Sequence, residues 1–469
     1  MTNSFIRFFT PKKLRSFYMS DLYPAVISLL VAFGAIFGIE IYTAALHTII
    51  AVIGLCISNS IKPTLISLLT FVMQLSVKNS PFYPNRSDYL YTGWRLFVVL
   101  AIFIAVIIGF SAFIYRNRVY KRTFLAFGKG RGYFALLFAA LLLNGAFYDK
   151  WTLSSLLFGI LNAALLCVFP VLLYNGFSEK ENSDDIAGYF SYLSLLVGLV
   201  ITAELFALYM TNDKIFAEGS INKVEVALGF GIWNLVGNSL IVLIPLIFYG
   251  IAKGKHPVLY FCVACAVYIA SVFTMSRNAL LVGTALYFIC ILIYCFYGRY
   301  QKFFRFFALF IILLALVFFA TFYGEIKKLL ADYFNRGLSD NGRFKLWGIA
   351  FKNFLSSPLF GCGFFGLDVD DSVLYSFGPV PKMAHNTLVQ LLSSSGLFGL
   401  FSYLLYRFFT LKEIFTRLSL KKTFMALSMA ALIAGSLVDN FIFNIYPLFS
   451  YTVSLVIIAK ENEERAKKL

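Results

Sequence analysis

The chain is built from apolar segments long enough to cross a lipid bilayer. A transmembrane helix needs about 20 mainly apolar residues, and runs of this order recur along the 469 residues, separated by short charged breaks. Hydrophobic residues make up 60% of the chain and charged residues only 13%, unlike the composition of soluble domains. Backbone polar groups inside a bilayer must bond to one another. The sequence therefore predicts an all-α integral membrane protein.

Fourteen apolar segments are candidate transmembrane helices. They are residues 22–39, 41–59, 64–78, 94–115, 132–148, 152–174, 187–210, 236–252, 257–275, 278–297, 304–322, 386–407, 423–439 and 441–459. The third, fifth and thirteenth are the weakest. We therefore expect 12 to 14 transmembrane helices in a single polytopic domain, residues 1–469.

The basic residues of the chain indicate its orientation in the membrane. The net charge of +17 is a possible sign of nucleic-acid binding, but Lys and Arg gather in the short breaks between apolar segments. There they set topology and meet anionic headgroups, so no nucleic-acid partner is expected. With the N-terminus inside, the basic breaks on the cytoplasmic side are 7–15, 116–122, 253–255, 299–305 and 407–422. The acidic break 175–186 is placed inside by parity alone.

One long polar segment, residues 323–385, interrupts the apolar pattern and is predicted to face outward. Within it, Arg343 to Ser356 has apolar residues at helical spacing, and Pro358 follows. This pattern predicts an amphipathic helix along the outer membrane interface. Arg343 and Trp347 are one turn apart, so a guanidinium can lie over an indole and still offer donors to a phosphate. A merely interfacial basic helix is the alternative.

Three further residues at the outer side are candidates for chemistry. Arg277, between two apolar segments, and Arg336, in the long segment, are possible anion ligands, although an interfacial Arg can also be purely structural. His385 precedes a new helix that Asn386 is placed to cap. An unperturbed imidazole suits proton removal from a hydroxyl near neutral pH, but a histidine at a helix start is more often structural.

Other motifs are assigned to structure. The pattern Gly361-x-Gly363-x-x-Gly366 matches a dinucleotide fingerprint, but no strand precedes it, so a tight return of the chain towards the membrane is preferred. Cys262 and Cys265 lie in an apolar segment without further ligands, which favours packing over metal binding. Glu204 within an apolar segment is costly and usually functional, but the sequence names no partner for it.

The order of several short motifs resembles the bacterial O-antigen polymerase and O-antigen ligase superfamily. The resemblance covers mainly residues 228–405. It rests on Gly237-Asn238 before Pro245, Ser276-Arg277, Arg343-x-x-x-Trp347, Pro358-Leu359-Phe360-Gly361-Cys362-Gly363, His385-Asn386 and Gly396-Leu397-Phe398-Gly399.

The resemblance implies a metal-independent and cofactor-free glycosyltransferase in the bacterial cytoplasmic membrane, with its active site outside. Its donor would be an undecaprenyl-diphosphate-linked oligosaccharide and its acceptor a hydroxyl of another lipid-linked glycan, for a capsule or another envelope polysaccharide. A chain-length regulator is a candidate partner. Arg277 and Arg343, with Arg336 as a looser third, would neutralise the diphosphate, and His385 would be the base.

Three other functions remain open. A ligase would pass the same glycan to a lipid, wall polymer or protein. A multi-pass transporter or lipid-linked glycan flippase also suits many spans, but no internal repeat is found and intramembrane charges are scarce. A non-catalytic scaffold for glycan assembly would need neither Arg343 nor His385.

Overall fold

The computed structural model describes residues 11–75, 93–119, 127, 130–149, 151–219, 221–253, 256–321, 323–324, 343–366 and 383–468. Within these ranges the chain is almost entirely helical. The strands described there are β1 (Ala227–Leu228) and β2 (Gly231–Ile232), each of two residues, and they pair as one antiparallel hairpin. The predicted all-α class is confirmed.

Every predicted apolar segment contains a helix. The first half of the chain contributes α2 (Pro11–Tyr18), α3 (Leu22–Phe37), α4 (Glu40–Ile57), α5 (Leu65–Leu75), α6 (Trp94–Arg116), α8 (Arg131–Leu142), α9 (Leu153–Ala163), α10 (Phe169–Gly176) and α11 (Ser183–Thr211). The second half contributes α12 (Trp233–Lys253), α13 (Pro257–Phe273), α14 (Arg277–Phe296), α15 (Gln301–Thr321), α17 (Arg343–Ser356), α19 (Thr387–Phe415), α20 (Leu420–Ser436) and α21 (Ile445–Ala466).

Not every described helix is long and apolar enough to cross a bilayer. Among the described residues, seven helices are long and apolar enough to span a bilayer, or eight if the bent pair α2 and α3 forms one span. Helices such as α8 and α13 are apolar but shorter. The chain is therefore a multi-pass membrane protein, and the count of about 14 spans remains a prediction.

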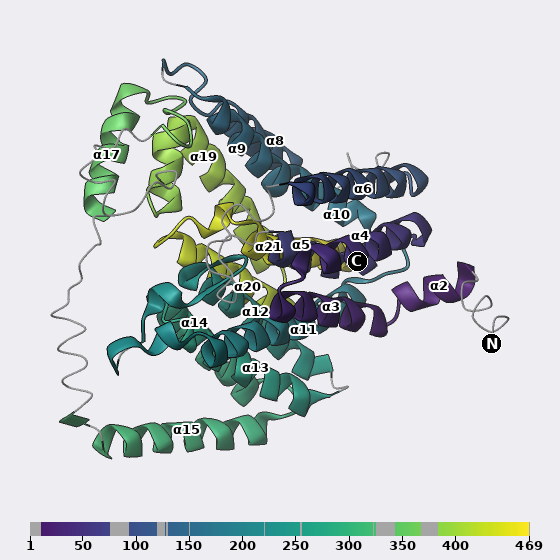
Figure 1. The fold of residues 1–469 in the computed structure, drawn as a ribbon, viewed down its shortest axis with the longest axis vertical. Helices are drawn as coiled ribbons and strands as arrows, with labels where there is room; N and C mark the ends of the chain where they lie inside the picture. The colour runs from purple at the N-terminus through teal and green to yellow at the C-terminus, as the bar shows by residue number, and fades with distance from the viewer. Residues whose placement is uncertain are drawn as a thin grey trace.

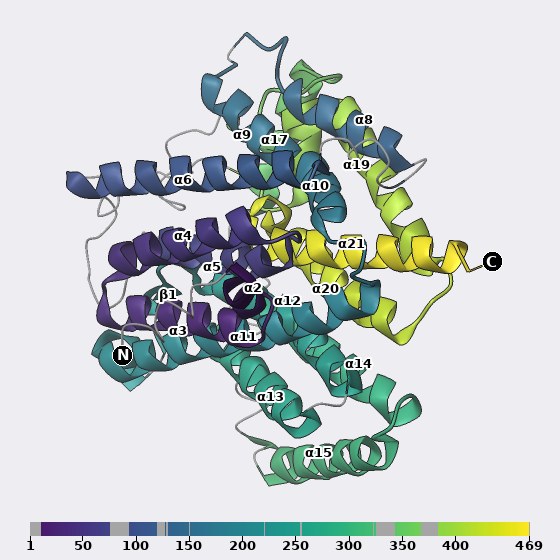
Figure 2. The same ribbon diagram turned by 90° about the vertical axis from the view of Figure 1, so that its right-hand side faces the viewer.

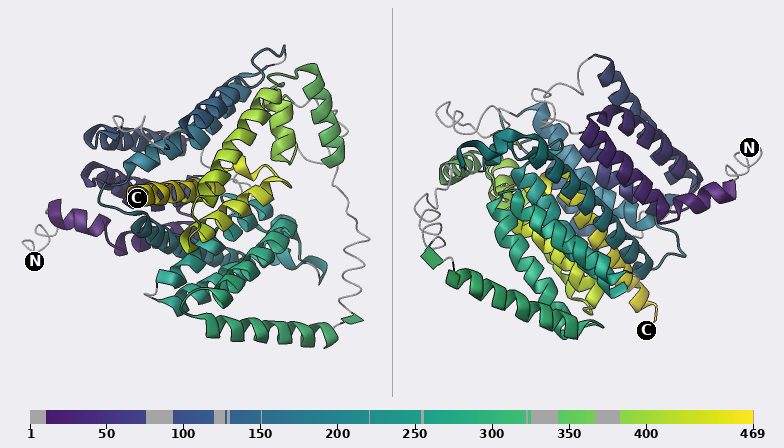
Figure 3. Two further views of the ribbon diagram at one scale, coloured as in Figure 1. Left: turned by 180° about the vertical axis from the view of Figure 1, so that it is seen from behind. Right: turned by 60° about the horizontal axis from the view of Figure 1, so that its bottom comes forward.

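Helix α12 lies at the centre of the structure. In the most apolar 18 residues of α12, 89% of the residues are buried, whereas the corresponding share in α6 is 22%. Helix α6 lies at one side of the molecule (Figure 1). Helices α11, α13, α14 and α20 pack around α12. Figure 3 shows these bundle helices running side by side, with the green helix α15 at the edge. Large apolar side chains exposed on α6 and α15 are what lipid-facing helices require.

Helix α19 is broken at Gly396, where φ is 64° and ψ is −160°. This differs from the unbroken span predicted for residues 386–407. The segment after α17 lies in the break. The N–H groups of Cys362 and Gly363 donate to the carbonyls of Ser393 and Ser394, and those of Leu397 and Phe398 donate to the carbonyls of Pro358 and Leu359. These bonds satisfy backbone groups that a broken helix leaves unpaired.

Glycine is required on both sides of this contact. A Cβ atom on Gly361 would lie 2.3 Å from the carbonyl carbon of Ser394, and one on Gly396 would lie 2.5 Å from that of Leu359. Both glycines also have positive φ. The glycine-rich motif therefore serves a close backbone contact with α19, and the return of the chain towards the membrane stays a prediction.

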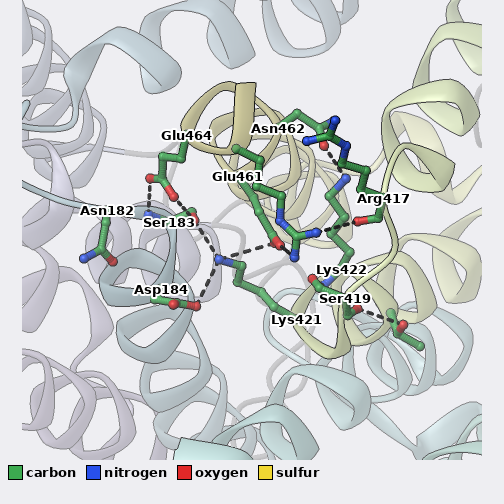
Figure 4. A network of polar contacts seen from close by, with 12 residues as sticks. Asn182, Ser183, Asp184, Arg417, Ser419, Lys421, Lys422, Glu461, Asn462 and Glu464 are labelled. Atoms are coloured by element: carbon green, nitrogen blue, oxygen red, sulfur yellow. Dashed lines mark hydrogen bonds and ion pairs between the residues drawn. The ribbon is translucent and has the colours of Figure 1, made fainter. Parts of the chain in front are cut away.

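A polar network lies at the end of the bundle opposite to the start of α19 (Figure 4). Lys421 Nζ lies 2.6 Å from Ser183 Oγ, 3.0 Å from Asp184 Oδ1 and 3.3 Å from Glu461 Oε2. Ser183 in turn donates to Glu464. The network joins the start of α11, the start of α20 and the end of α21, so the breaks 175–186 and 407–422 lie at one end, as predicted.

Candidate active site

Helix α17 holds Arg343 and Trp347 close to the segment that carries His385. It spans the residues predicted for the amphipathic helix, and it runs steeply across the direction of α4 and α6 (Figures 1 and 2). Phe344, Phe351 and Leu355 are exposed on it, as expected for a face against lipid. The packed face is instead formed by Leu346, Ala350 and Asn353, whose amide donates to Gly366 O at 2.9 Å.

Trp347 anchors α17 to the residue before His385. Its Nε1 donates to Ala384 O at 2.7 Å. Its ring packs edge-on against Phe344, with the two ring centroids 5.3 Å apart. The stacking expected between Trp347 and the Arg343 guanidinium is not seen among the described contacts. Trp347 therefore acts here as a support for the backbone, and Arg343 lies one helical turn away from it.

His385 is paired with an acid that the sequence analysis did not select. Its Nδ1 lies 3.0 Å from Asp439 Oδ1, and both side chains are partly exposed. Asp439 follows α20 and also accepts a hydrogen bond from Asn440 N–H at 2.8 Å. A carboxylate on Nδ1 favours the tautomer that keeps the proton there, with the lone pair on Nε2. This arrangement suits a general base.

Asn386 orders the start of α19, so the predicted cap is confirmed. Its Oδ1 accepts from Leu388 N–H at 2.9 Å and Val389 N–H at 3.2 Å. Its Nδ2 donates to Leu437 O at 2.8 Å, two residues before Asp439. One side chain therefore fixes both backbone segments that carry the His385–Asp439 pair.

Arg277 lies at the same end of the bundle as this pair. It is exposed in the first turn of α14, which Ser276 caps. The next residue, Asn278, donates to Asn238 Oδ1 at 3.3 Å, and a Cβ on Gly435 would touch both side chains. The carbonyl of Gly435 accepts from Asp439 N–H at 2.9 Å. A short chain of contacts thus links the Arg277 segment to Asp439.

The remaining candidates are less informative. Arg336 lies outside the described residues. Glu204 is buried in α11, and its Oε1 has no hydrogen-bond partner among the residues that the structure describes. Cys265 Sγ contacts the Tyr287 hydroxyl at 3.0 Å, in agreement with a packing role. Burial raises the pKa of the Cys362 thiol, which makes it a poor nucleophile at neutral pH.

Asp439 could have been found from its position. It is the last residue of the predicted segment 423–439, on the side assigned to His385. An acid at the end of an apolar segment, on the same side as a candidate base, was the available signal. In the described part of the chain, no group of three or more His, Cys, Asp or Glu side chains could hold a metal ion.

One protein family matches a region of the chain that holds three of these candidate residues. Residues 260–404 match the O-antigen ligase family. The matched region contains Arg277, Arg343 and His385 and confirms the resemblance to the O-antigen ligase and polymerase superfamily, over somewhat less than a third of the chain. It supports a glycan transferase of the ligase or polymerase type that uses lipid-linked glycans. No curated protein matches the chain.

Proposed function

We propose that this protein is a polysaccharide polymerase at the outer face of the bacterial cytoplasmic membrane. It transfers an oligosaccharide from undecaprenyl diphosphate to a hydroxyl of another lipid-linked glycan. The observation that carries the proposal is the pairing of His385 with Asp439. The ligase-family match over residues 260–404, which include His385 but not Asp439, supports it. A lipid diphosphate is an activated donor that an enzyme outside the cell can use without nucleotide sugars.

In the proposed reaction, His385 removes the proton from the acceptor hydroxyl. The hydroxyl oxygen forms a bond to the anomeric carbon of the donor, and the bond from that carbon to the diphosphate oxygen breaks. The diphosphate leaves with the electron pair. Asp439 stabilises the imidazolium that forms. Since the leaving group departs as an anion, no strong general acid is required.

Arg277 and Arg343 are proposed to bind the diphosphate. Each begins a helix on the side where His385 lies, and a guanidinium offers paired donors to phosphate oxygens. Arg336 is a third proposed ligand. Trp347 and Asn386 support the site through the backbone contacts described above. Negative charge develops on the diphosphate as it leaves, and cationic donors aimed at it stabilise the transition state more than the ground state.

A ligase is the second candidate, and the description of the matched family favours it. The donor and the chemistry are the same, but the acceptor is a lipid, wall polymer or protein. The family match disfavours the transporter and flippase alternatives, whose function requires no base at His385.

The test uses the purified chain in detergent with a lipid-diphosphate oligosaccharide. Release of lipid diphosphate together with glycans of doubled and higher length supports the polymerase. Release that depends on an added non-glycan acceptor supports the ligase. If neither product forms, the proposal of glycan transfer is contradicted. The same assay in EDTA should proceed at an unchanged rate, because no step requires a metal.

The outward orientation has its own test. Lys352 on α17 and Lys412 on α19 are both exposed. With Cys56 and Cys262 replaced by Ser, Lys352→Cys should react with an impermeant maleimide in intact cells made permeable only at any outer barrier. Lys412→Cys should react only after lysis. The reverse pattern would contradict the proposed orientation.

A further inference from the structure

The backbone immediately before His385 is held by two side chains. Gln390 Oε1 accepts a hydrogen bond from Ala384 N–H at 2.8 Å, and Trp347 Nε1 donates to Ala384 O at 2.7 Å. Ala384 and Gln390 are both fully buried. Solvent therefore cannot replace either bond at no cost, and both polar groups of Ala384 have fixed partners.

His385 needs such support because its backbone is in the left-handed region. Its φ is 50°, which a residue with a Cβ adopts only where its surroundings determine it. The peptide plane between Ala384 and His385 is the plane from which this φ is measured. Trp347 holds the carbonyl of this plane, and Gln390 holds the Ala384 N–H, which belongs to the preceding peptide between Met383 and Ala384. Together the two bonds fix Ala384 on both sides of its Cα, and with it the direction in which the imidazole leaves the chain towards Asp439.

Gln390 also connects this segment to the glycine-rich segment. Its Nε2 donates to Phe364 O at 3.1 Å, and Phe364 is fully buried. Cys362 and Gly363, just before Phe364, are bonded to the broken helix α19. The oxygen of the Gln390 carboxamide thus accepts a hydrogen bond from the segment that carries His385. Its nitrogen donates one to the segment packed into the break of α19.

We propose that Gln390 is the positioning residue of His385. It does not touch the substrate. It holds the Ala384 N–H, and Trp347 holds the Ala384 carbonyl, so that Nε2 of His385 meets the acceptor hydroxyl. Through its bond to Phe364 O, Gln390 also ties the position of the base to the glycine-rich segment. The inference rests on the proposed function, since it assigns a role within that reaction.

The first test compares Gln390→Leu with Gln74→Leu. Leucine has a similar size but makes neither hydrogen bond. Gln74 is an equally buried glutamine whose carboxamide bonds to His47 and Thr43, away from the site. Both variants should melt at lower temperature than the parent. Only Gln390→Leu should lower kcat, by about 10- to 100-fold, with the donor KM within about two-fold, because a misplaced base weakens the transition state alone.

The second test uses Gln390→Glu, in case the leucine variant does not fold. A protonated carboxyl offers one acceptor and one donor, as the amide does, whereas an ionised one offers acceptors only. The rate relative to the parent should therefore be near one at low pH and fall as pH rises and the carboxyl ionises. A ratio that is equally low at every pH would overturn the proposal. A parental kcat for folded Gln390→Leu would overturn it as well.

These outcomes are separate from failure of the proposed function. If His385→Ala transfers glycan at the parental rate, the catalytic role itself is wrong. If His385→Ala is inactive while Gln390→Leu keeps the parental kcat, the reaction stands and only the positioning role is wrong.

Discussion

His385 and Asp439 are 54 positions apart in the chain, yet their side chains meet at 3.0 Å. Asn386 strengthens this relationship by bonding to Leu437 O close to the acid. The start of α19 and the end of α20 are thereby joined at the candidate site. The carboxylate favours the tautomer with the proton on Nδ1 and so leaves Nε2 of His385 free to accept a proton.

Asp439→Asn should lower the transfer rate by roughly 10²-fold, since an amide cannot stabilise the imidazolium as a carboxylate does. Expression and donor binding should remain near parental levels. The rate of lipid diphosphate release measures the effect. Asp213→Asn, at an exposed acid beyond α11, is the control and should be neutral. Equal rates for both variants would remove Asp439 from catalysis.

Arg343→Lys should be nearly as damaging as Arg343→Ala, because a point charge does not replace a planar fork on two phosphate oxygens. We expect a higher donor KM and a lower kcat in both. Lys352→Ala, at an exposed position on the same helix, should be mild. Full turnover by Arg343→Lys at normal protein level would rule out bidentate phosphate recognition.

Gly396→Ala should destabilise the protein by about 2–4 kcal/mol, through backbone strain at positive φ and overlap with Leu359. Thermal unfolding in detergent gives the change. Gly348→Ala on α17 is the matched control, because a Cβ there meets nothing within 4 Å. Similar melting temperatures for the two variants would contradict the role assigned to the break in α19.

Helix positions were largely predictable from the sequence, because long apolar runs leave a membrane chain few alternatives. The limits of α17 followed from the spacing of its apolar residues and from Pro358. The break at Gly396 was not predicted, since hydropathy continues through it and only the bonded segment at residues 358–363 explains it. The Asp439 partner was missed because its contact with His385 joins distant segments, and only its place at the end of the predicted segment 423–439 pointed to it.

Lys421→Met should destabilise the fold without changing the chemistry. Lys421 is buried between Asp184 and Glu461, and its loss leaves buried Glu461 paired with Arg465 alone. The cost should lie below the value of about 3–5 kcal/mol for a buried charge with no partner. Turnover per folded molecule should stay parental, because the network lies at the end opposite to His385. Lys412→Met, at an exposed position, should change neither property. A loss of turnover in folded Lys421→Met protein would connect this network to the site.

The central claim is that His385 is the base, and one assay tests it most directly. Purified His385→Ala and His385→Gln are incubated in detergent with a lipid-diphosphate oligosaccharide, and released lipid diphosphate and lengthened glycan are measured. Both variants should bind the donor but transfer about 10²- to 10⁴-fold more slowly, because neither side chain accepts a proton at neutral pH. Parental rates in both variants would contradict the mechanism and leave His385 a structural residue at the start of α19.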